Sequence, residues 1–537
     1  ASGGFFTNLA GGTIGAPFHL LTSSMNIEGA LTLNSFLFTG GGLHGPQALT
    51  IGNGGQFTWT GGTLATTAIL TLAAGATGTL NGATLIAQGT INNGGQVTMQ
   101  SGILTGMGST PCTFNNLAGG VVNLNGWNTS QAAWHMVTNN AGTFNKNNGA
   151  ENFTFGNDFS FKSFTNQAGG VVNVPAGTLT LNVPLPLQDG TFTVSNGATL
   201  TGTNAFNFAG PTILNNGSIT TPVLRYQGTS AQQLNGTGTL TSLAIDNATG
   251  VDLGGDQTVT NTLTMTNGQL RLGNNDLFVE NNALGAVAGG NATSWVVNNG
   301  TGSLHRQVIG SGYLFPVGTT SYTPLTLGIT GPQDRFSVRV QDGVSTNYGA
   351  PGEANGAPIT ARAVGRTWVV AEQVGGGNTG DITVQWNASD ELPQFNRNLC
   401  AVSRYDGTDW QTGTFAAALG AGPFTRALSG VNAFREFSVG DNLLNLNTAL
   451  DDLDAQRSAV PLLYPQPADQ VLHVVAPEGG MFRGIRLFDA SGRLAGSTSF
   501  RSEHAVLDVS ALPPGVYVLE WTDDRLNIGR TPVMVSY

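Results

Sequence analysis

Residues 164–174, FTNQAGGVVNV, contain the pattern that decides the fold: a pair of glycines followed by a short segment of alternating apolar side chains. Residues 114–124, FNNLAGGVVNL, repeat it almost unchanged. Between Gly12 and Gly217 a Gly beside another Gly, Asn or Ala recurs at spacings of 17 to 28 residues. Gly and Asn tolerate the positive φ that tight corners require. Short strands at this period are typical of a parallel β-solenoid, or β-helix, in which each rung buries its inward side chains against its neighbours.

The pattern continues to about residue 295, so we predict a solenoid over residues 1–300 with roughly 12 to 15 rungs of about 20 to 25 residues. Its outward positions are mostly Thr, Asn, Ser and Gln. We expect their amides and hydroxyls to stack in ladders. Such ladders would keep the surface hydrated, although residues 1–145 contain a single charged side chain, Glu28.

The composition changes near residue 300, because residues 1–300 hold only four of the 20 basic side chains. Longer alternating segments, such as FSVRV at 336–340, then replace the short ones, with Gly, Pro and Asp between them. They predict an antiparallel β-sandwich over 301–445. Residues 446–460 carry an acidic cluster, which we interpret as part of a solvated linker, with a cation site as the alternative. Its members are Asp451, Asp452 and Asp454.

The charge of the chain excludes several classes of partner. The net charge is −11 and only two lysines occur, whereas nucleic-acid binding and polybasic membrane attachment need clustered cations. No apolar run approaches the roughly 18 residues of a transmembrane helix. The sequence begins at Ala1 without the features of a signal peptide, so we expect a mature, exported form.

Residues 461–537 form a third predicted β unit, and three motifs follow one another in it. Tyr464, Pro465, Gln466 and Pro467 open the unit, and Asp489, Gly492 and Arg493 form an Asp-x-x-Gly-Arg turn. The third motif comprises Leu507, Asp508, Ser510, Leu512, Gly515, Val516, Tyr517 and Leu519. Together they resemble the C-terminal sorting domains of type IX secretion in Bacteroidetes. Gln466 stands where that family has Asn, and the final RTPVMVSY lacks the family's lysines.

This resemblance implies a small Ig-like β-sandwich and export across the outer membrane. It also implies two kinds of partner: the type IX translocon, and the machinery that processes the sorting domain. The expected location is extracellular or at the outer cell surface. Residues 301–445 are similar, more weakly, to the sandwich modules that precede such domains.

The sequence contains no phosphate-binding loop, nucleophile elbow or paired metal-ligand spacing, so we expect no cofactor, no metal and no enzymatic activity. One cluster of carboxylates stands out near Arg271. Asp252 and Asp276, like Asp256 and Glu280, are 24 residues apart, a spacing that predicts stacking on successive rungs. Glycosidic chemistry needs such a carboxylate pair. The interpretation that we favour is a solvated or cation-neutralised edge of the solenoid.

The sequence therefore predicts an all-β protein that acts outside the cell without catalysis, as a structural or adhesin-like element. Because the open end of a solenoid presents unpaired backbone groups, self-association into fibres is a further hypothesis. The alternative is a protein that binds or degrades a polysaccharide, with a glycan as its ligand.

Overall fold

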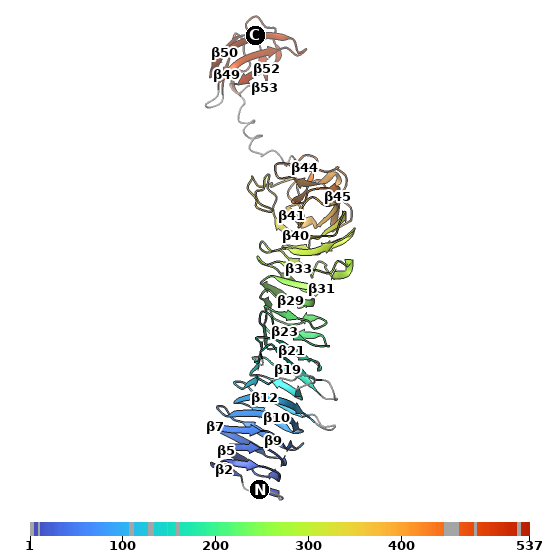
Figure 1. The fold of residues 1–537 in the computed structure, drawn as a ribbon. Helices are drawn as coiled ribbons and strands as arrows, with labels where there is room; N and C mark the ends of the chain where they lie inside the picture. Colours follow the sequence, from blue (N-terminus) through green and yellow to red (C-terminus); the bar gives the residue numbers. More distant parts are fainter. Residues whose placement is uncertain are drawn as a thin grey trace. The chain divides into compact units, whose positions relative to one another are not determined.

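The computed structural model describes residues 5–8, 11–106, 112–126, 134–147, 149–156, 162–444, 461–476, 481–523 and 528–536. The chain divides into two compact units, Ala1–Leu444 and Asn445–Tyr537 (Figure 1). The described residues form β-strands and three short 3-10 segments, which confirms the predicted all-β class. The predicted linker at 446–460, with its aspartates, lies outside the described residues.

The glycine pairs form the corners of the solenoid as expected, and each member of a pair has its own reason. Gly119 and Gly169 have φ values of 82° and 79°, in the region that favours glycine. The next residues, Gly120 and Gly170, pass so close to the preceding rung that an added Cβ would lie 2.3 Å from a backbone oxygen. One glycine thus makes the turn, and the other allows the rungs to stack.

Fourteen successive parallel pairings carry one face of the solenoid from β1 (Phe5–Asn8) to β36 (Leu304–Val308). Strands β2 (Gly12–Ile14) and β3 (Phe18–Leu20) begin the stacks of the two other faces. At about 4.8 Å per step the stack is roughly 65 to 70 Å long. The predicted solenoid is confirmed, with a rung number in the expected range.

Asparagine ladders run along the solenoid both inside and outside. The inward ladder has Nδ2–Oδ1 distances of 2.8, 2.7 and 2.7 Å and joins Asn93, Asn116, Asn140 and Asn166. On the outer surface, two 2.9 Å bonds join Asn92, Asn115 and Asn139. The expected polar ladders are therefore present, and one of them is buried. Its amides satisfy one another's hydrogen bonds without bringing any charge into the core.

Parallel stacking ends where β35 (Val296–Val297) pairs with β38 (Val317–Gly318), beyond the boundary predicted at residue 300. On another face, β36 pairs antiparallel with β40 (Asp334–Asp342), so an antiparallel strand covers the edge of the last parallel one. The first sheet of the sandwich continues from β40 through β41 (Arg366–Glu372), β46 (Glu436–Asp441), β43 (Cys400–Tyr405) and β44 (Trp410–Thr412). The second contains β37 (Tyr313–Phe315), β39 (Leu325–Thr330), β42 (Thr379–Trp386) and β45 (Phe424–Val431). One continuous hydrophobic core runs through both parts.

The C-terminal unit is a small sandwich of two antiparallel sheets around its own core. One sheet contains β47 (Leu462–Tyr464), β48 (Val471–Val475) and β51 (His504–Asp508). The other contains β50 (Leu494–Ser502), β49 (Phe482–Phe488), β52 (Gly515–Asp523) and β53 (Ile528–Val535). The predicted C-terminal β-sandwich is thus confirmed.

Candidate functional site

The four carboxylates singled out in the sequence lie on the last rungs of the solenoid, but not in the predicted register. Strand β33 (Leu277–Val279) pairs with β31 (Gln257–Asn267) so that Gln257 faces Leu277. This pairing places Asp256 beside Asp276, a step of 20 residues. The stacking predicted from the 24-residue spacing is therefore wrong, because the final rungs are shorter than the average rung on which it relied.

Three of these carboxylates contact a cationic side chain. Asp252 pairs with Arg271, with an Nε–Oδ1 distance of 2.5 Å. Glu280 pairs with Arg335 of β40, with an Nη2–Oε1 distance of 2.5 Å. Asp276 lies 3.4 Å from Nε2 of His305.

The two remaining contacts come from the backbone. The amide of Ser303 donates to Asp276 at 2.8 Å, and Asp256 accepts from the amide of Asp276 at 2.8 Å. Burial opposes ionisation of Asp276, yet the hydrogen bonds from His305 and Ser303 hold the pKa of this carboxyl below its usual value. Each of the four carboxylates is thus held by a specific donor rather than being solvated.

A pocket of about 280 Å³ lies next to these ion pairs, where the solenoid meets the first sandwich sheet. The ring centroids of Phe278 and His305 are 4.4 Å apart, and the guanidinium carbon of Arg335 lies 5.2 Å from the centroid of Phe278. The lining residues are Phe278, His305, Arg335, Ser337, Ala371, Glu372 and Gln373. The pocket went unnoticed in the sequence because its residues come from four strands spread over nearly 100 positions.

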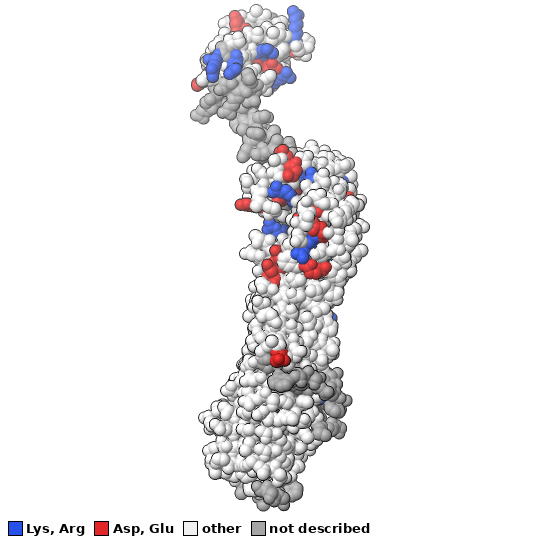
Figure 2. Space-filling view, in the orientation of Figure 1, with Lys and Arg blue, Asp and Glu red and all other residues white. Residues whose placement is uncertain are grey.

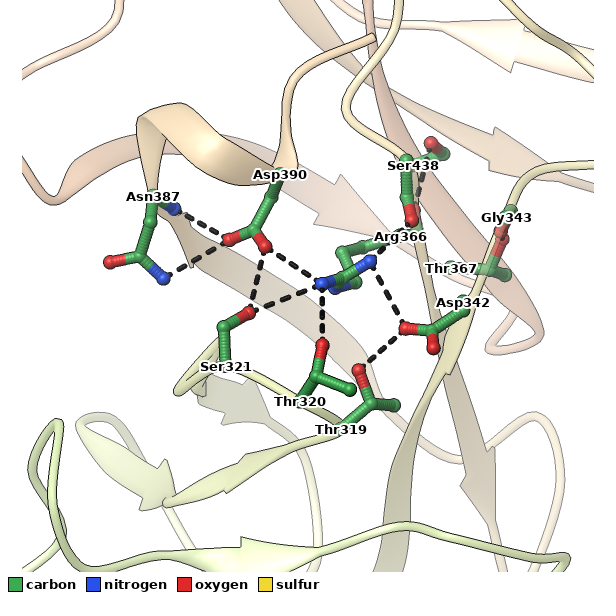
Figure 3. Close-up of polar contacts among 11 residues, drawn as sticks. Thr319, Thr320, Ser321, Asp342, Gly343, Arg366, Thr367, Asn387, Asp390 and Ser438 are labelled. Atoms are coloured by element: carbon green, nitrogen blue, oxygen red, sulfur yellow. Dashed lines mark hydrogen bonds and ion pairs between the residues drawn. The ribbon is translucent and has the colours of Figure 1, made fainter.

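A second polar cluster surrounds Arg366 at the start of β41 (Figure 3). The guanidinium lies between two carboxylates, 2.8 Å from Asp390 and 3.0 Å from Asp342. Asp390 also accepts from the hydroxyl of Ser321, in the loop that follows the last parallel strand. Because Asp390 is buried, this cluster fastens the sandwich to the end of the solenoid. We interpret it as a structural clamp.

In the C-terminal unit, the first motif joins the start of the domain to its last strand. Tyr464 stacks on His473, with ring centroids 4.9 Å apart, and is 44% exposed. The side chain of Gln466 accepts a 3.1 Å hydrogen bond from the amide of Met534 in β53. Pro465 and Pro467 flank this residue, and Ala468 then bonds to Met534 through its backbone. The Gln that replaces the family's Asn therefore makes a contact with β53.

The other two motifs form turns. Oδ1 of Asp489 accepts from the amides of Ser491 and Arg493 at 2.9 and 3.0 Å, and Gly492 has a φ of 78°. These bonds, together with one from the Ser491 hydroxyl, lower the pKa of Asp489. Asp508 caps the next turn in the same way through Ser510.

Residues that follow the Asp508 turn fix the start of β52. The amide of Leu512 donates to Val509, and the Tyr517 hydroxyl donates to the Pro513 carbonyl at 2.8 Å, just before β52 begins at Gly515. All three motifs thus build the fold of the domain, because their polar groups are used internally.

The outer face of the β50–β49–β52–β53 sheet is different, because apolar side chains are exposed on it. Leu494 and Val518 lie opposite Phe488 on neighbouring strands, and Val516 lies opposite Met534. All of them except Phe488 are more than a third exposed. A contiguous exposed apolar surface of this kind marks a contact site for another molecule.

Comparison with known protein families matches residues 462–533 to the secretion system C-terminal sorting domain. The match spans the three motifs from Tyr464 to Tyr517. No curated protein and no solved structure matches the chain. Within the described part of the chain, no helix is long and apolar enough to cross a bilayer.

Proposed function

We propose that this β-solenoid substrate of the type IX secretion system is a non-catalytic element of the outer cell surface, with a structural or adhesin-like role. Its sorting domain directs it to the cell surface or the extracellular space. The translocon and the processing machinery are the partners that this domain implies.

The state of the carboxylates is the observation that carries the proposal. A glycosidase needs one carboxyl group free to donate a proton and a second free to act as base or nucleophile. Here Asp252, Asp276 and Glu280 each contact a cation, and Asp256 accepts a backbone hydrogen bond. These contacts favour fixed, ionised carboxylates, which suit an architectural role better than proton transfer.

The surface of the solenoid supports the same conclusion. On the face drawn in Figure 2, charged side chains are nearly absent until the last rungs. Neutral ladders of Asn and Thr supply many weak hydrogen-bonding groups at regular intervals but no strong acid or base. A long, regular surface of this kind suits adhesion or packing between neighbouring molecules.

Two measurements test the proposal. Incubation of the purified full chain with a panel of polysaccharides, followed by a reducing-sugar assay, should show no turnover. Turnover that is lost in Asp252→Ala or Asp276→Ala would overturn the proposal. Cells that lack the protein should show weaker attachment or an altered surface layer by electron microscopy while growing normally on polysaccharides.

The fibre hypothesis needs a separate test. Size-exclusion chromatography and negative-stain imaging of the full chain at rising concentration should reveal end-to-end assemblies. A monodisperse monomer at the highest concentration would remove the fibre from the proposal but leave the surface role intact.

A further inference from the structure

The pocket at the end of the solenoid has a floor made by one row of outward-facing positions. The register places Phe278 opposite His305, His305 opposite Ser337 and Ser337 opposite Ala371, across four adjacent strands. Phe278 and His305 supply aromatic surface, and Ser337 and Ala371 are small. The row is therefore hollow at its sandwich end and aromatic at its solenoid end.

Polar groups around this floor retain hydrogen-bonding capacity. Among the described residues, the Ser337 hydroxyl and the Gln373 side-chain amide have no protein partner, and Arg335 uses only Nη2, to reach Glu280. The carboxylate of Glu372 accepts one bond per oxygen, from Asn378 at 2.7 Å and from the amide of Gly376 at 3.0 Å. Each oxygen has a second lone pair. The pocket thus offers both donors and acceptors beside an aromatic ring.

The charge balance decides which kind of ligand fits. Glu372 is held by neutral donors, while Arg335 is already paired with Glu280 and His305 lies against Asp276. The surroundings are therefore negative overall and disfavour an anion. The volume of about 280 Å³ is just below the roughly 300–1,000 Å³ of drug-sized ligand sites, which suits a single ring.

We propose that this pocket binds one pyranose ring of a neutral polysaccharide, with the apolar face of the sugar against Phe278 and its hydroxyls on Arg335, Ser337 and Glu372. The inference rests on the proposed surface function and deepens it, because it names the class of ligand that the protein would hold. Binding occurs without cleavage, since the nearest carboxylates, Asp276 and Glu280, contact cations.

Saturation-transfer-difference NMR and calorimetry with the full chain test the proposal. The probes are hexasaccharides of glucose, xylose, mannose and N-acetylglucosamine, with hexagalacturonate as the acidic comparison. At least one neutral probe should bind, and more tightly than hexagalacturonate. Phe278→Ala should weaken binding about tenfold, because a lost stacking contact of about 1 to 1.5 kcal/mol corresponds to that factor.

A second variant protects the test against misfolding of the first. Ser337→Leu fills the pocket without removing a contact and should also abolish binding. Thr258→Ala is the matched control, because Thr258 faces Phe278 from the previous rung but does not line the pocket. It should bind like the wild type, and circular dichroism should show that all three variants are folded.

Three results would overturn the inference: no binding of any neutral probe at millimolar concentration, preference for hexagalacturonate, or equal binding by wild type, Phe278→Ala and Ser337→Leu. None of them affects the surface role, which depends on the absence of turnover and on the attachment of cells. Cleavage of a bound probe, by contrast, would overturn the proposed function even if the pocket binds sugar.

Discussion

Replacing Asn116 by Ala should open the middle of the solenoid far more than the same replacement one residue earlier. Asn116 is an inner member of the buried ladder. It accepts from Asn93 at 2.8 Å and donates to Asn140 at 2.7 Å, and its amide also reaches the carbonyl oxygens of Gly120 and Thr143, at 3.3 and 3.1 Å. No water replaces these partners in the closed core.

The magnitude follows from these contacts. The two ladder bonds account for about 2 kcal/mol, at about 1 kcal/mol each, and the stranded Oδ1 of Asn140 costs about 1 to 3 kcal/mol more. We therefore expect Asn116→Ala to lower the local free energy of unfolding by about 3 to 5 kcal/mol.

Asn115 is the matched control, because it lies on the same strand and makes two outward ladder bonds of 2.9 Å, to Asn92 and Asn139. Its side chain is half-buried, so water can replace both partners. Asn115→Ala should therefore cost only about 0.5 to 1 kcal/mol.

Hydrogen exchange followed by mass spectrometry suits this comparison, since a repeat protein opens locally and a single global midpoint would average over its rungs. In peptides covering residues 112–126 and 134–147, Asn116→Ala should speed exchange about a hundredfold relative to Asn115→Ala. If the two variants exchange within a factor of about two of each other, the buried ladder does not stabilise the rungs.

Four further predictions concern other parts of the chain. Lys146 is buried and donates to the carbonyls of Gly149 and Ala176, and burial lowers its pKa to about 8; because this value lies below that of the unfolded chain, stability against urea should rise between about pH 8 and pH 10, and Lys146→Met should remove the rise. Arg366→Met leaves Asp390 buried without its cation and should cost about 3 to 5 kcal/mol in urea unfolding of the first unit. Tyr517→Phe removes one hydrogen bond and should lower the stability of the sorting domain, measured by hydrogen exchange in residues 505–523, by about 1 kcal/mol. Val518→Asp on the exposed apolar face should reduce secretion of a folded protein, because the sorting motifs are used internally and leave this face for the secretion machinery; normal export would show that recognition occurs elsewhere.

Local sequence signals were sufficient for the parts of the fold that depend on local geometry. The glycine pairs at 119–120 and 169–170 predicted corners because one residue needs a positive φ and the next a close approach. Asp489 and Asp508 predicted turns because a short acidic side chain caps the amides that follow it. Both kinds of signal lie within about five residues and need no knowledge of distant partners.

The candidate site was less predictable, because it depends on register and on strands far away in sequence. Steps between stacked strands vary from 18 residues, between Ser24 and Gly42, to 30, between Leu104 and Trp134. An average period therefore cannot say which carboxylates are neighbours. Arg335 reaches Glu280 only because β40 pairs antiparallel with β36, a pairing that no feature of the alternating segments specifies.

The position of the charged residues follows from the same stacking rule. Inside the solenoid each side chain lies in register with similar side chains above and below, so a charge repeated on successive rungs would repel its own copies. Neutral amides and hydroxyls escape this penalty, because each donates to one neighbour and accepts from the other. At the end of the stack, β40 brings an unrelated sequence against the last rung, and opposite charges such as Arg335 and Glu280 can meet there. The junction is thus the place where this fold favours the convergence of unlike polar groups, and it is the place where the pocket lies.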